Sequence, residues 1–231
     1  MVMTSFLSES TTFSQTLDQL KGETVLVLGH RRPDGDCIGS QVALTRILQN
    51  LGVNARAVNA DPSPRTLTKF LGDTKLHRPE DIADTNAIII TVDCADHARV
   101  GDQLKDRFPK VFLNIDHHVS NTKFAEHNLV LSEASATGEI LAKFFFDCGY
   151  TVDKTTAEAL YLGICTDTGQ FCYAGTNASV FDVSFSRYCL VALSGSDPLG
   201  ILVHSVSTLR PRKRPSRQQR RMMYKYNRPN V

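Results

Sequence analysis

The sequence has no apolar run close to the ~20 residues that a membrane-spanning helix needs. Its longest such run, around Ala87–Val92, has only the length of a strand. The first ten residues contain no basic segment followed by an apolar stretch, so we expect no secretory signal. Together these absences predict a cytoplasmic protein without membrane association.

The six cysteines lack both C-x-x-C pairing and regular spacing. They predict buried or incidental thiols in a reducing compartment, which again favours the cytoplasm. The cysteines are Cys37, Cys94, Cys148, Cys165, Cys172 and Cys189.

Acidic residues are missing from residues 209–231, which contain nine Lys or Arg. Residues 1–208 contain 17 basic and 24 acidic residues, a net charge of −7. The body of the protein is therefore acidic and its C-terminal segment strongly basic. An acidic body that handles phosphates needs cations to do so, and this already indicates a metal site.

A length of 231 residues allows one large α/β domain, or one domain and a fragment of a second. Apolar runs of strand length alternate along the chain with segments of helical periodicity. This alternation predicts an α/β fold, a doubly wound and mostly parallel sheet with helices on both faces. The expected strands are 24–28, 55–59, 87–92 and 111–115, with an edge strand at 128–131; the expected helices are 10–20, 37–51, 135–148 and 153–165, with a helical turn at 102–108.

The periodic pattern weakens after about residue 177. Residues 178–193 fit one more helix, whereas residues 194–206 show no clear period. From Thr208 the composition is that of a disordered basic tail. We therefore divide the chain into a domain at residues 1–193 and a linker with a basic tail at residues 194–231.

Polar residues of metal-binding type follow three of the expected strands directly. In an open parallel sheet the ligand site lies beyond the carboxyl ends of the strands, so we expect these side chains to converge. A loop after the last long apolar helix could bring one more aspartate to the same edge. The residues are His30, Asp34 and Asp36 after the first strand, Asp93 after the third, Asp116, His117 and His118 after the fourth, and Asp167 after the helix.

Such a cluster holds five aspartates and three histidines. Ionised carboxylates this close together repel strongly, so either several are protonated or cations neutralise them. Oxygen and imidazole ligands suit Mn²⁺, Mg²⁺, Fe²⁺ or Zn²⁺ rather than a structural zinc of the cysteine type. The number of ligands favours two ions, and a pair ~3.5–4 Å apart generates a hydroxide and holds phosphoryl oxygens during displacement.

Each element also has an ordinary structural interpretation. Pro33-Asp34-Gly35 is a turn signal by itself, Asp93 could cap a strand end, and His117-His118 could be loop residues. Asp167-Thr168-Gly169 is similar to the aspartic-protease signature, but that enzyme needs a β-rich fold. The chain has no G-x-G-x-x-G and no G-x-x-x-x-G-K-[ST], so dinucleotide and P-loop sites lack support. The coincidence of all these residues at one predicted edge favours the metal site.

Four ordered motifs of this sequence resemble those of the DHH phosphoesterases, over roughly residues 15–190. The closest branch comprises small bacterial enzymes that degrade very short RNAs and dephosphorylate 3′-phosphoadenosine 5′-phosphate (pAp). Cyclic-dinucleotide phosphodiesterases are similar, while inorganic pyrophosphatases of this type and the RecJ exonucleases are more distant. The motifs are residues 29–40 (GHRRPDGDCIGS), Val92-Asp93, residues 114–118 (NIDHH) and residues 163–171 (GICTDTGQF).

The resemblance implies a role for each residue. His30 and Asp34 would bind a first Mn²⁺, Asp36, His117 and Asp167 a second, and Asp93 would bridge both. Asp116 would orient a neighbouring histidine, and His118 would face the substrate phosphate and stabilise charge in the transition state. Arg99 lies where the branch often has an arginine, and it would contact phosphate or support the structure.

The implied activity is manganese-dependent hydrolysis of phosphate esters in short RNA, dinucleotides or nucleotide phosphates, by water that two metal ions activate. Mg²⁺ or another divalent ion could replace Mn²⁺, and the resemblance allows a homodimer. A protein of another class, a nucleotide- or RNA-binding remnant with weak catalysis, is the alternative.

The resemblance ends near Ser194. Members of the branch continue into a second domain, DHHA1, which grips the far end of the substrate, and residues 194–231 resemble neither that domain nor its linker. A truncated or out-of-frame remnant explains the sudden change to Arg, Pro, Ser and Gln. A natural basic arm that binds nucleic acid through phosphates also explains it. Of the two, we expect truncation.

Overall fold

Six parallel strands form one sheet in the order β3-β2-β1-β4-β5-β6, within the residues that the computed structural model describes: 6–83, 86–173, 176 and 179–180. The strands are β1 (Thr24–Leu28), β2 (Asn54–Val58), β3 (Leu76–His77), β4 (Ile88–Val92), β5 (Leu113–Asp116) and β6 (His127–Val130). The helices are α1 (Leu7–Asp18), α2 (Gly35–Asn50), α3 (Asp102–Arg107), α4 (Thr137–Asp147) and α5 (Lys154–Asp167), with short 3-10 helices η1 (Thr68–Leu71), η2 (Pro79–Asp81) and η3 (His97–Val100).

The strand order reverses between β1 and β4. The chain builds outward from β1 through β2 to β3, then returns to place β4 on the other side of β1, with Val25 paired to Ile88. Strands β5 and β6 continue from there, and all the strand pairs are parallel. In a doubly wound sheet this switch point leaves a crevice beyond the carboxyl ends of the strands. The residues that follow β1, β4 and β5 therefore lie around that crevice.

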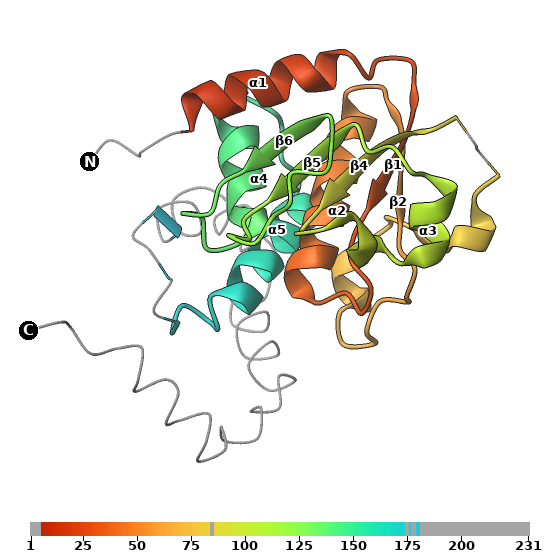
Figure 1. Cartoon of the computed structure of the whole chain (residues 1–231). Helices are drawn as coiled ribbons and strands as arrows, with labels where there is room; N and C mark the ends of the chain where they lie inside the picture. The colour runs from red at the N-terminus through yellow and green to blue at the C-terminus, as the bar shows by residue number, and fades with distance from the viewer. Residues whose placement is uncertain (1–5, 84–85, 174–175, 177–178, 181–231) are drawn as a thin grey trace, which may run out of the picture. The chain divides into compact units, whose positions relative to one another are not determined.

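Helices cover both faces of the sheet, as the sequence predicts (Figure 1). Alternate residues of β1 point to opposite faces, which is the period of a strand. Val25 and Val27 join the larger apolar core, to which α1, α2, α4 and α5 contribute. Leu26 and Leu28 join a smaller core with residues of η3 and α3.

Two glycines allow α2 and α5 to pack closely. A Cβ atom on Gly39 would lie 2.2 Å from the carbonyl oxygen of Ala159. A Cβ atom on Gly163 would lie 2.6 Å from Oδ1 of Asp36. A larger side chain at either position would separate the helices or displace the aspartate.

The predicted elements are present, with β1 at its predicted bounds and the ends of the others shifted by at most three residues. The first helix begins at Leu7 rather than at residue 10, and the second begins at Gly35 because Asp34 caps it by accepting from the N–H of Cys37. Asp153 caps α5 as expected. The two-residue strand β3 and the 3-10 helices were not predicted from the sequence. Of the helix expected at residues 178–193, only 179–180 lie among the described residues, and the basic tail lies outside them.

One prediction about the loops was wrong. Asp167 was expected on a loop after the helix, but it is the last residue of α5. The helix continues two residues beyond the predicted end at Cys165, and the N–H of Thr168 still donates to the carbonyl oxygen of Ile164 at 3.1 Å. Asp167 is therefore positioned by regular backbone.

None of the helices in the described part of the chain is both long and apolar enough to cross a membrane. The described cysteines are all free thiols.

Candidate metal centre

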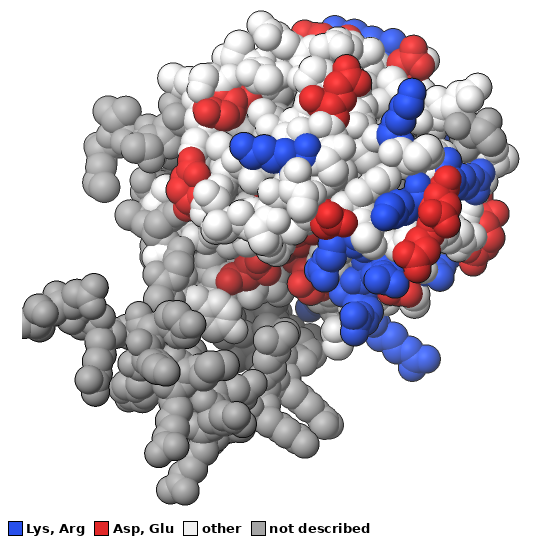
Figure 2. Space-filling model, in the orientation of Figure 1, with Lys and Arg blue, Asp and Glu red and all other residues white. Residues whose placement is uncertain are grey.

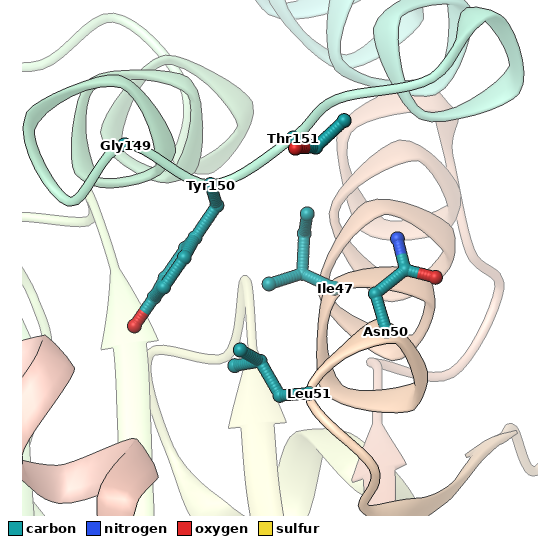
Figure 3. Close-up of a pocket in the computed structure, with 6 residues that line it drawn as sticks. All are labelled: Ile47, Asn50, Leu51, Gly149, Tyr150 and Thr151. Atoms are coloured by element: carbon teal, nitrogen blue, oxygen red, sulfur yellow. The ribbon is translucent and has the colours of Figure 1, made fainter.

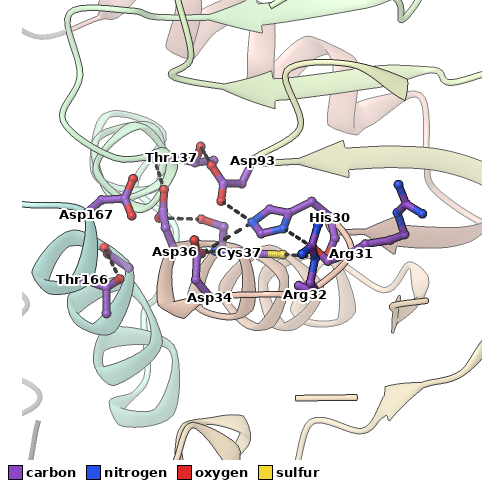
Figure 4. Close-up of polar contacts among 12 residues, drawn as sticks. His30, Arg31, Arg32, Asp34, Asp36, Cys37, Asp93, Thr137, Thr166 and Asp167 are labelled. Atoms are coloured by element: carbon purple, nitrogen blue, oxygen red, sulfur yellow. Dashed lines mark hydrogen bonds and ion pairs between the residues drawn. The ribbon is translucent and has the colours of Figure 1, made fainter. Parts of the chain in front are cut away.

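The carboxyl ends of β1 and β4 bring together a first cluster of His30, Asp34 and Asp93. Nε2 of His30 lies 3.6 Å from Oδ1 of Asp34 and 3.4 Å from Oδ2 of Asp93. One ligand atom from each of these residues lies within 4.8 Å of the others. Figure 4 shows the three side chains pointing toward one another from the loop after β1 and the end of β4. Their spacing suits a single ion.

A second cluster combines Asp36 from α2, His117 from the loop after β5 and Asp167 from the end of α5. Nε2 of His117 lies 3.2 Å from Oδ2 of Asp167 and 3.9 Å from Oδ2 of Asp36. Their ligand atoms also lie within 4.8 Å of one another. The second cluster therefore draws its residues from three elements that are distant in the sequence.

Asp93 faces both clusters with different oxygens. Its Oδ2 is directed to His30 at 3.4 Å, and its Oδ1 lies 3.7 Å from both Nε2 of His117 and Nδ1 of His118. Asp93 has φ 58, a left-handed conformation that is uncommon outside glycine. This conformation turns the chain immediately after β4 and directs the carboxylate between the clusters.

The N-terminus of α4 holds Asp36. The backbone N–H groups of Thr137 and Gly138 donate to its two oxygens at 2.7 and 2.8 Å, and the hydroxyl of Ser40 donates at 3.3 Å. Thr137 also donates its hydroxyl to Oδ1 of Asp93 at 3.2 Å. Thr137 and Gly138 were not among the site residues predicted from the sequence. An acid that meets a helix N-terminus about 100 residues away leaves no local pattern.

Backbone contacts determine which nitrogen of His30 is free. Nδ1 lies 2.8 Å from the carbonyl oxygen of Arg31, which can only accept, so Nδ1 carries the proton. In the neutral ring Nε2 then presents its lone pair to the first cluster. This is the usual arrangement for an imidazole ligand whose second nitrogen is fixed by a hydrogen bond.

Asp116 orients His118. Its Oδ1 lies 2.7 Å from Nδ1 of His118, and its Oδ2 accepts from Nδ2 of Asn121 at 2.6 Å. Asn121 also donates to the carbonyl oxygen of Cys94, beside Asp93. The side chain of Asp116 is fully buried and that of His118 is 38% exposed. His118 therefore points its other nitrogen away from Asp116. Asn121, like Thr137 and Gly138, was not predicted from the sequence.

The charges of the second cluster are unbalanced in a way that a cation would relieve. Burial, then the charges of Asp93 and Asp167, raise the pKa of Asp36 well above its usual value. Burial also raises the pKa of Asp167. For His117, burial acts to lower the pKa, but the carboxylates around it outweigh this and raise it to about 9.

The donor set fits divalent metal ions. Nε2 of His117 is buried and has no hydrogen-bond partner among the described residues, although three carboxylates surround it. An orphaned imidazole nitrogen among carboxylate oxygens is what a metal ligand looks like without its ion. A third possible grouping, Asp93 with His117 and His118, uses Nδ1 of His118, the atom that already bonds to Asp116.

Arg99 is brought near the centre through the backbone. Its carbonyl oxygen accepts from the N–H of Arg31 at 2.7 Å, so η3 is joined to the loop that carries His30. The side chains of Arg31, Arg32 and Arg99 are exposed. Figure 2 shows Lys and Arg gathered on one side of the face drawn, mixed with acidic residues. The surface is not uniformly acidic, despite the net charge of the body.

A separate hollow of about 240 Å³ lies at the other end of α2 (Figure 3). The ring of Tyr150 forms one wall, and Ile47, Asn50 and Leu51 of α2 and its C-terminal turn form another. The metal-ligand residues are at the start of α2, so this hollow does not belong to the candidate centre.

Comparison with known proteins identifies the domain. Residues 24–164 match the model of the N-terminal domain of the DHH family. The bifunctional oligoribonuclease and PAP phosphatase NrnA of Thermus thermophilus is 32% identical over 160 residues, which are 69% of this chain and 48% of that protein. A probable manganese-dependent inorganic pyrophosphatase of Streptococcus mutans is 29% identical over 153 residues, 62% of this chain and 48% of that protein. The chain spans about half the length of the curated relatives it matches.

Solved structures share the fold. An exopolyphosphatase-related protein of Bacteroides fragilis superposes with a TM-score of 0.77 at 23% identity, over 91% of this chain and 64% of that one. A putative family II inorganic pyrophosphatase of Methanococcus jannaschii has a TM-score of 0.61 at 21% identity, over 78% of this chain and 61% of that one. The α/β architecture predicted from the sequence is confirmed.

Proposed function

The chain belongs to the DHH family, and from this premise we propose that it hydrolyses phosphate esters of short oligonucleotides or nucleotide phosphates with two divalent metal ions, preferably Mn²⁺. The observation that carries the proposal is Asp93, whose two oxygens face two separate clusters of ligand-type residues. A carboxylate placed in this way is suited to bridge a pair of ions.

The two clusters divide the ligands between the ions. His30 and Asp34 would hold the first, and Asp36, His117 and Asp167 the second, with Asp93 shared. Bound in this way, the pair would supply a hydroxide at neutral pH and neutralise phosphoryl oxygens. The N–H groups at the start of α4 keep Asp36 in place, so this ligand is fixed before an ion arrives.

His118 acts on the substrate side. Its Nδ1 is held by Asp116, so its Nε2 is available to donate a proton to a phosphoryl oxygen. The hydrogen bond to Asp116, with its charge, raises the pKa of His118, which favours the protonated ring that donates. The partial exposure of this side chain allows contact with a ligand from solvent.

Two observations support oligonucleotides or nucleotide phosphates as the substrate class: the names of the relatives and the exposed arginines of this chain. The Thermus relative is described as acting on oligoribonucleotides and PAP. Exposed Arg31 and Arg32 follow His30 in the chain, and Arg99 is joined to Arg31 through the backbone, so their charges are candidates for contact with additional phosphates. A cytoplasmic location, where short RNAs and nucleotide phosphates occur, is part of the proposal.

The experiment measures hydrolysis of pAp and of two- to five-nucleotide RNA by the full chain with Mn²⁺, together with metal content after dialysis. For the unmodified chain we expect release of phosphate or mononucleotides and about two ions per chain. For Asp93→Ala we expect loss of the hydrolysis and of bound metal. Asp106→Asn, which removes an exposed charge on α3, is the matched control and should behave as the unmodified chain. A folded protein that binds no divalent ion would refute the proposal.

A further inference from the structure

Two buried amides, Gln41 of α2 and Asn59 directly after β2, lie behind the loop that carries His30. Both side chains are 0% exposed, and neither is a proposed metal ligand. Burying an amide costs free energy unless hydrogen bonds compensate for the lost water. A buried polar pair at this place is therefore expected to hold neighbouring groups in position.

Gln41 joins β1 to β2 through its side chain. Its Nε2 donates to the carbonyl oxygen of Val27 in β1 and to that of Val58 in β2, both at 3.0 Å. Its Oε1 accepts from Nδ2 of Asn59 at 2.9 Å. All three distances are those of good hydrogen bonds, so the amide of Gln41 has one defined orientation.

Asn59 is fixed to the opposite neighbour of β2. Its N–H donates to the carbonyl oxygen of His77 in β3 at 3.0 Å, and its own carbonyl oxygen accepts from Nη1 of Arg78 at 3.4 Å. Its Oδ1 is buried and has no hydrogen-bond partner among the described residues. The bond to Gln41 is therefore the contact that directs the amide of Asn59.

Gly29, the residue before His30, packs directly against Gln41. A Cβ atom on Gly29 would lie 2.4 Å from Sγ of Cys37 and 2.5 Å from Oε1 of Gln41. Gly29 does not have a positive φ, so lack of space, and not backbone conformation, requires a glycine here. The side chains of Gln41 and Cys37 therefore determine where the backbone before His30 can lie.

Cys37 contacts both residues that belong to the first cluster alone. Its N–H donates to Oδ1 of Asp34 at 3.2 Å, and its Sγ lies 3.9 Å from the carbonyl oxygen of His30 (Figure 4). The same sulfur lies 3.7 Å from Oε1 of Gln41. Contacts through sulfur are weak, but with the packing at Gly29 they connect Gln41 continuously to the first cluster.

The second cluster is held by other groups. Asp36 accepts from N–H groups of α4, and Asp167 is the last residue of α5. The hydrogen bonds of Gln41 within the described residues go to Val27, Val58, Asn59 and Cys37 only. A change at Gln41 should therefore affect the first cluster more than the second.

We propose that Gln41, together with Asn59, is a positioning residue for His30 and so sets the affinity of the first ion without binding that ion. The inference rests on the proposed function, because it requires the first cluster to hold an ion. Ligands must be held within about 0.5 Å of the productive geometry. An apolar side chain at position 41 would remove the partners of Val27, Val58 and Asn59, so the backbone at Gly29 would lose its support.

The test titrates the full chain with Zn²⁺, a diamagnetic ion that imidazole ligands bind, and follows the ring signals of His30 and His117 by NMR. Each ring reports the ion at its own cluster, and each signal is assigned by its loss in His30→Gln or His117→Gln. A chelator buffers the free Zn²⁺. In Gln41→Met, which keeps the length but loses the amide, we expect the midpoint at His30 to rise about tenfold or more. The midpoint at His117 should change less than about threefold, because only Asp93 is shared.

Gln49→Met is the matched control. This amide lies on the same helix and also bonds to β2, but it donates to the carbonyl oxygen of Ala55 near the start of the strand, at 2.9 Å. Both midpoints should stay unchanged in this variant. Asn59→Ala keeps the bonds of Gln41 to the two strands and removes only the partner of its Oε1. It should raise the midpoint at His30 about threefold or more, and it decides the test if Gln41→Met does not fold.

Three results would count against the proposal. An equal rise at His30 and His117 in Gln41→Met overturns it, because a general loss of stability weakens both clusters alike. An unchanged midpoint at His30 in folded Gln41→Met, or in Asn59→Ala where that variant decides, overturns it as well. If neither ring of the unmodified chain responds to Zn²⁺, the proposed metal centre itself is refuted, and this inference with it.

Discussion

Asn121 is joined to Asp116 by a hydrogen bond of 2.6 Å, and the other oxygen of Asp116 holds His118 at 2.7 Å. The amide of Asn121 therefore holds the carboxylate of Asp116, and this carboxylate in turn orients the imidazole of His118. Burial acts to raise the pKa of Asp116, but the bonds from His118 and Asn121 outweigh it and lower the pKa. Asp116 is thus kept ionised as an acceptor.

We predict that Asn121→Ala lowers kcat about 10- to 100-fold, the usual effect of losing such a supporting partner, with little change in metal content. Asn121→Asp should be at least as damaging. It keeps the oxygen that caps the N–H of Lys123 at 2.7 Å, but it loses the donor and adds a charge beside Asp116. Steady-state kinetics and elemental analysis provide the measurement. Asn128→Ala is the control, because this amide bonds to the backbone of Ala125 and not to Asp116, and the variant should retain activity. Equal losses of activity in the Asn121 and Asn128 variants would show that Asn121 has a purely structural role.

Asp93→Ala should be the most damaging single change at the centre, because this carboxylate alone faces both clusters. Its removal leaves two cations without a bridge. We expect hydrolysis to fall to the background of the assay and metal content to fall below one ion per chain. Asp34→Ala, which removes a ligand of the first cluster only, should retain more metal. If Asp93→Ala kept two ions, the assignment of the bridge would be wrong.

Gly163→Ala tests the contact between α5 and Asp36. The new methyl group would lie 2.6 Å from Oδ1 of Asp36, so either the helix or the carboxylate must move. We expect a loss of about 1–3 kcal/mol in stability, typical of overpacking. We also expect weaker binding of one of the two ions. Thermal unfolding without metal measures the loss of stability alone. Titration with Mn²⁺ measures the change in ion affinity. An unchanged affinity for both ions would contradict the predicted displacement of the Asp36 carboxylate and would show that the helix moves instead.

Metal binding should release protons and strengthen as the pH rises from 6 to 9. In the metal-free protein the pKa of His117 is raised to about 9, so this ring holds a proton near neutrality, and burial raises the pKa of Asp36 and Asp167, so these carboxyl groups bind protons more readily than usual. An ion binds only the deprotonated ligands, and higher pH removes the competing protons. Calorimetry in two buffers of different ionisation enthalpy counts the protons released. His127→Gln, at the first residue of β6 and so at the opposite end of the parallel sheet from both clusters, should not alter the count. An affinity independent of pH would contradict the prediction.

The sequence predicted the sheet because its strands are short apolar runs, each followed by a turn signal or a helix. It also indicated that seven of the eight ligand-type residues lie at one edge, because they follow strand ends of a parallel sheet, whereas Asp167 reaches that edge as the last residue of α5; their role as ligands stays a prediction. It could not predict strand β3, since two residues carry no period. It could not place Asn121 or the N–H groups of Thr137 and Gly138 either. Those contacts depend on the distance between elements, and neither an amide in a loop nor a backbone donor has a sequence signature.

The bonds from α4 to Asp36 have a consequence for how the protein folds. The proposed ligands for the two ions extend from residue 30 to residue 167 along the chain. One of them, Asp36, is held by N–H groups of a helix that begins at Thr137. No single hairpin or loop can gather them, so the ion-binding geometry arises only after the long-range contacts of the sheet have formed. Divalent ions in excess should therefore slow unfolding and raise the melting temperature of the whole domain, because they bind the native chain and find no comparable site on the unfolded one.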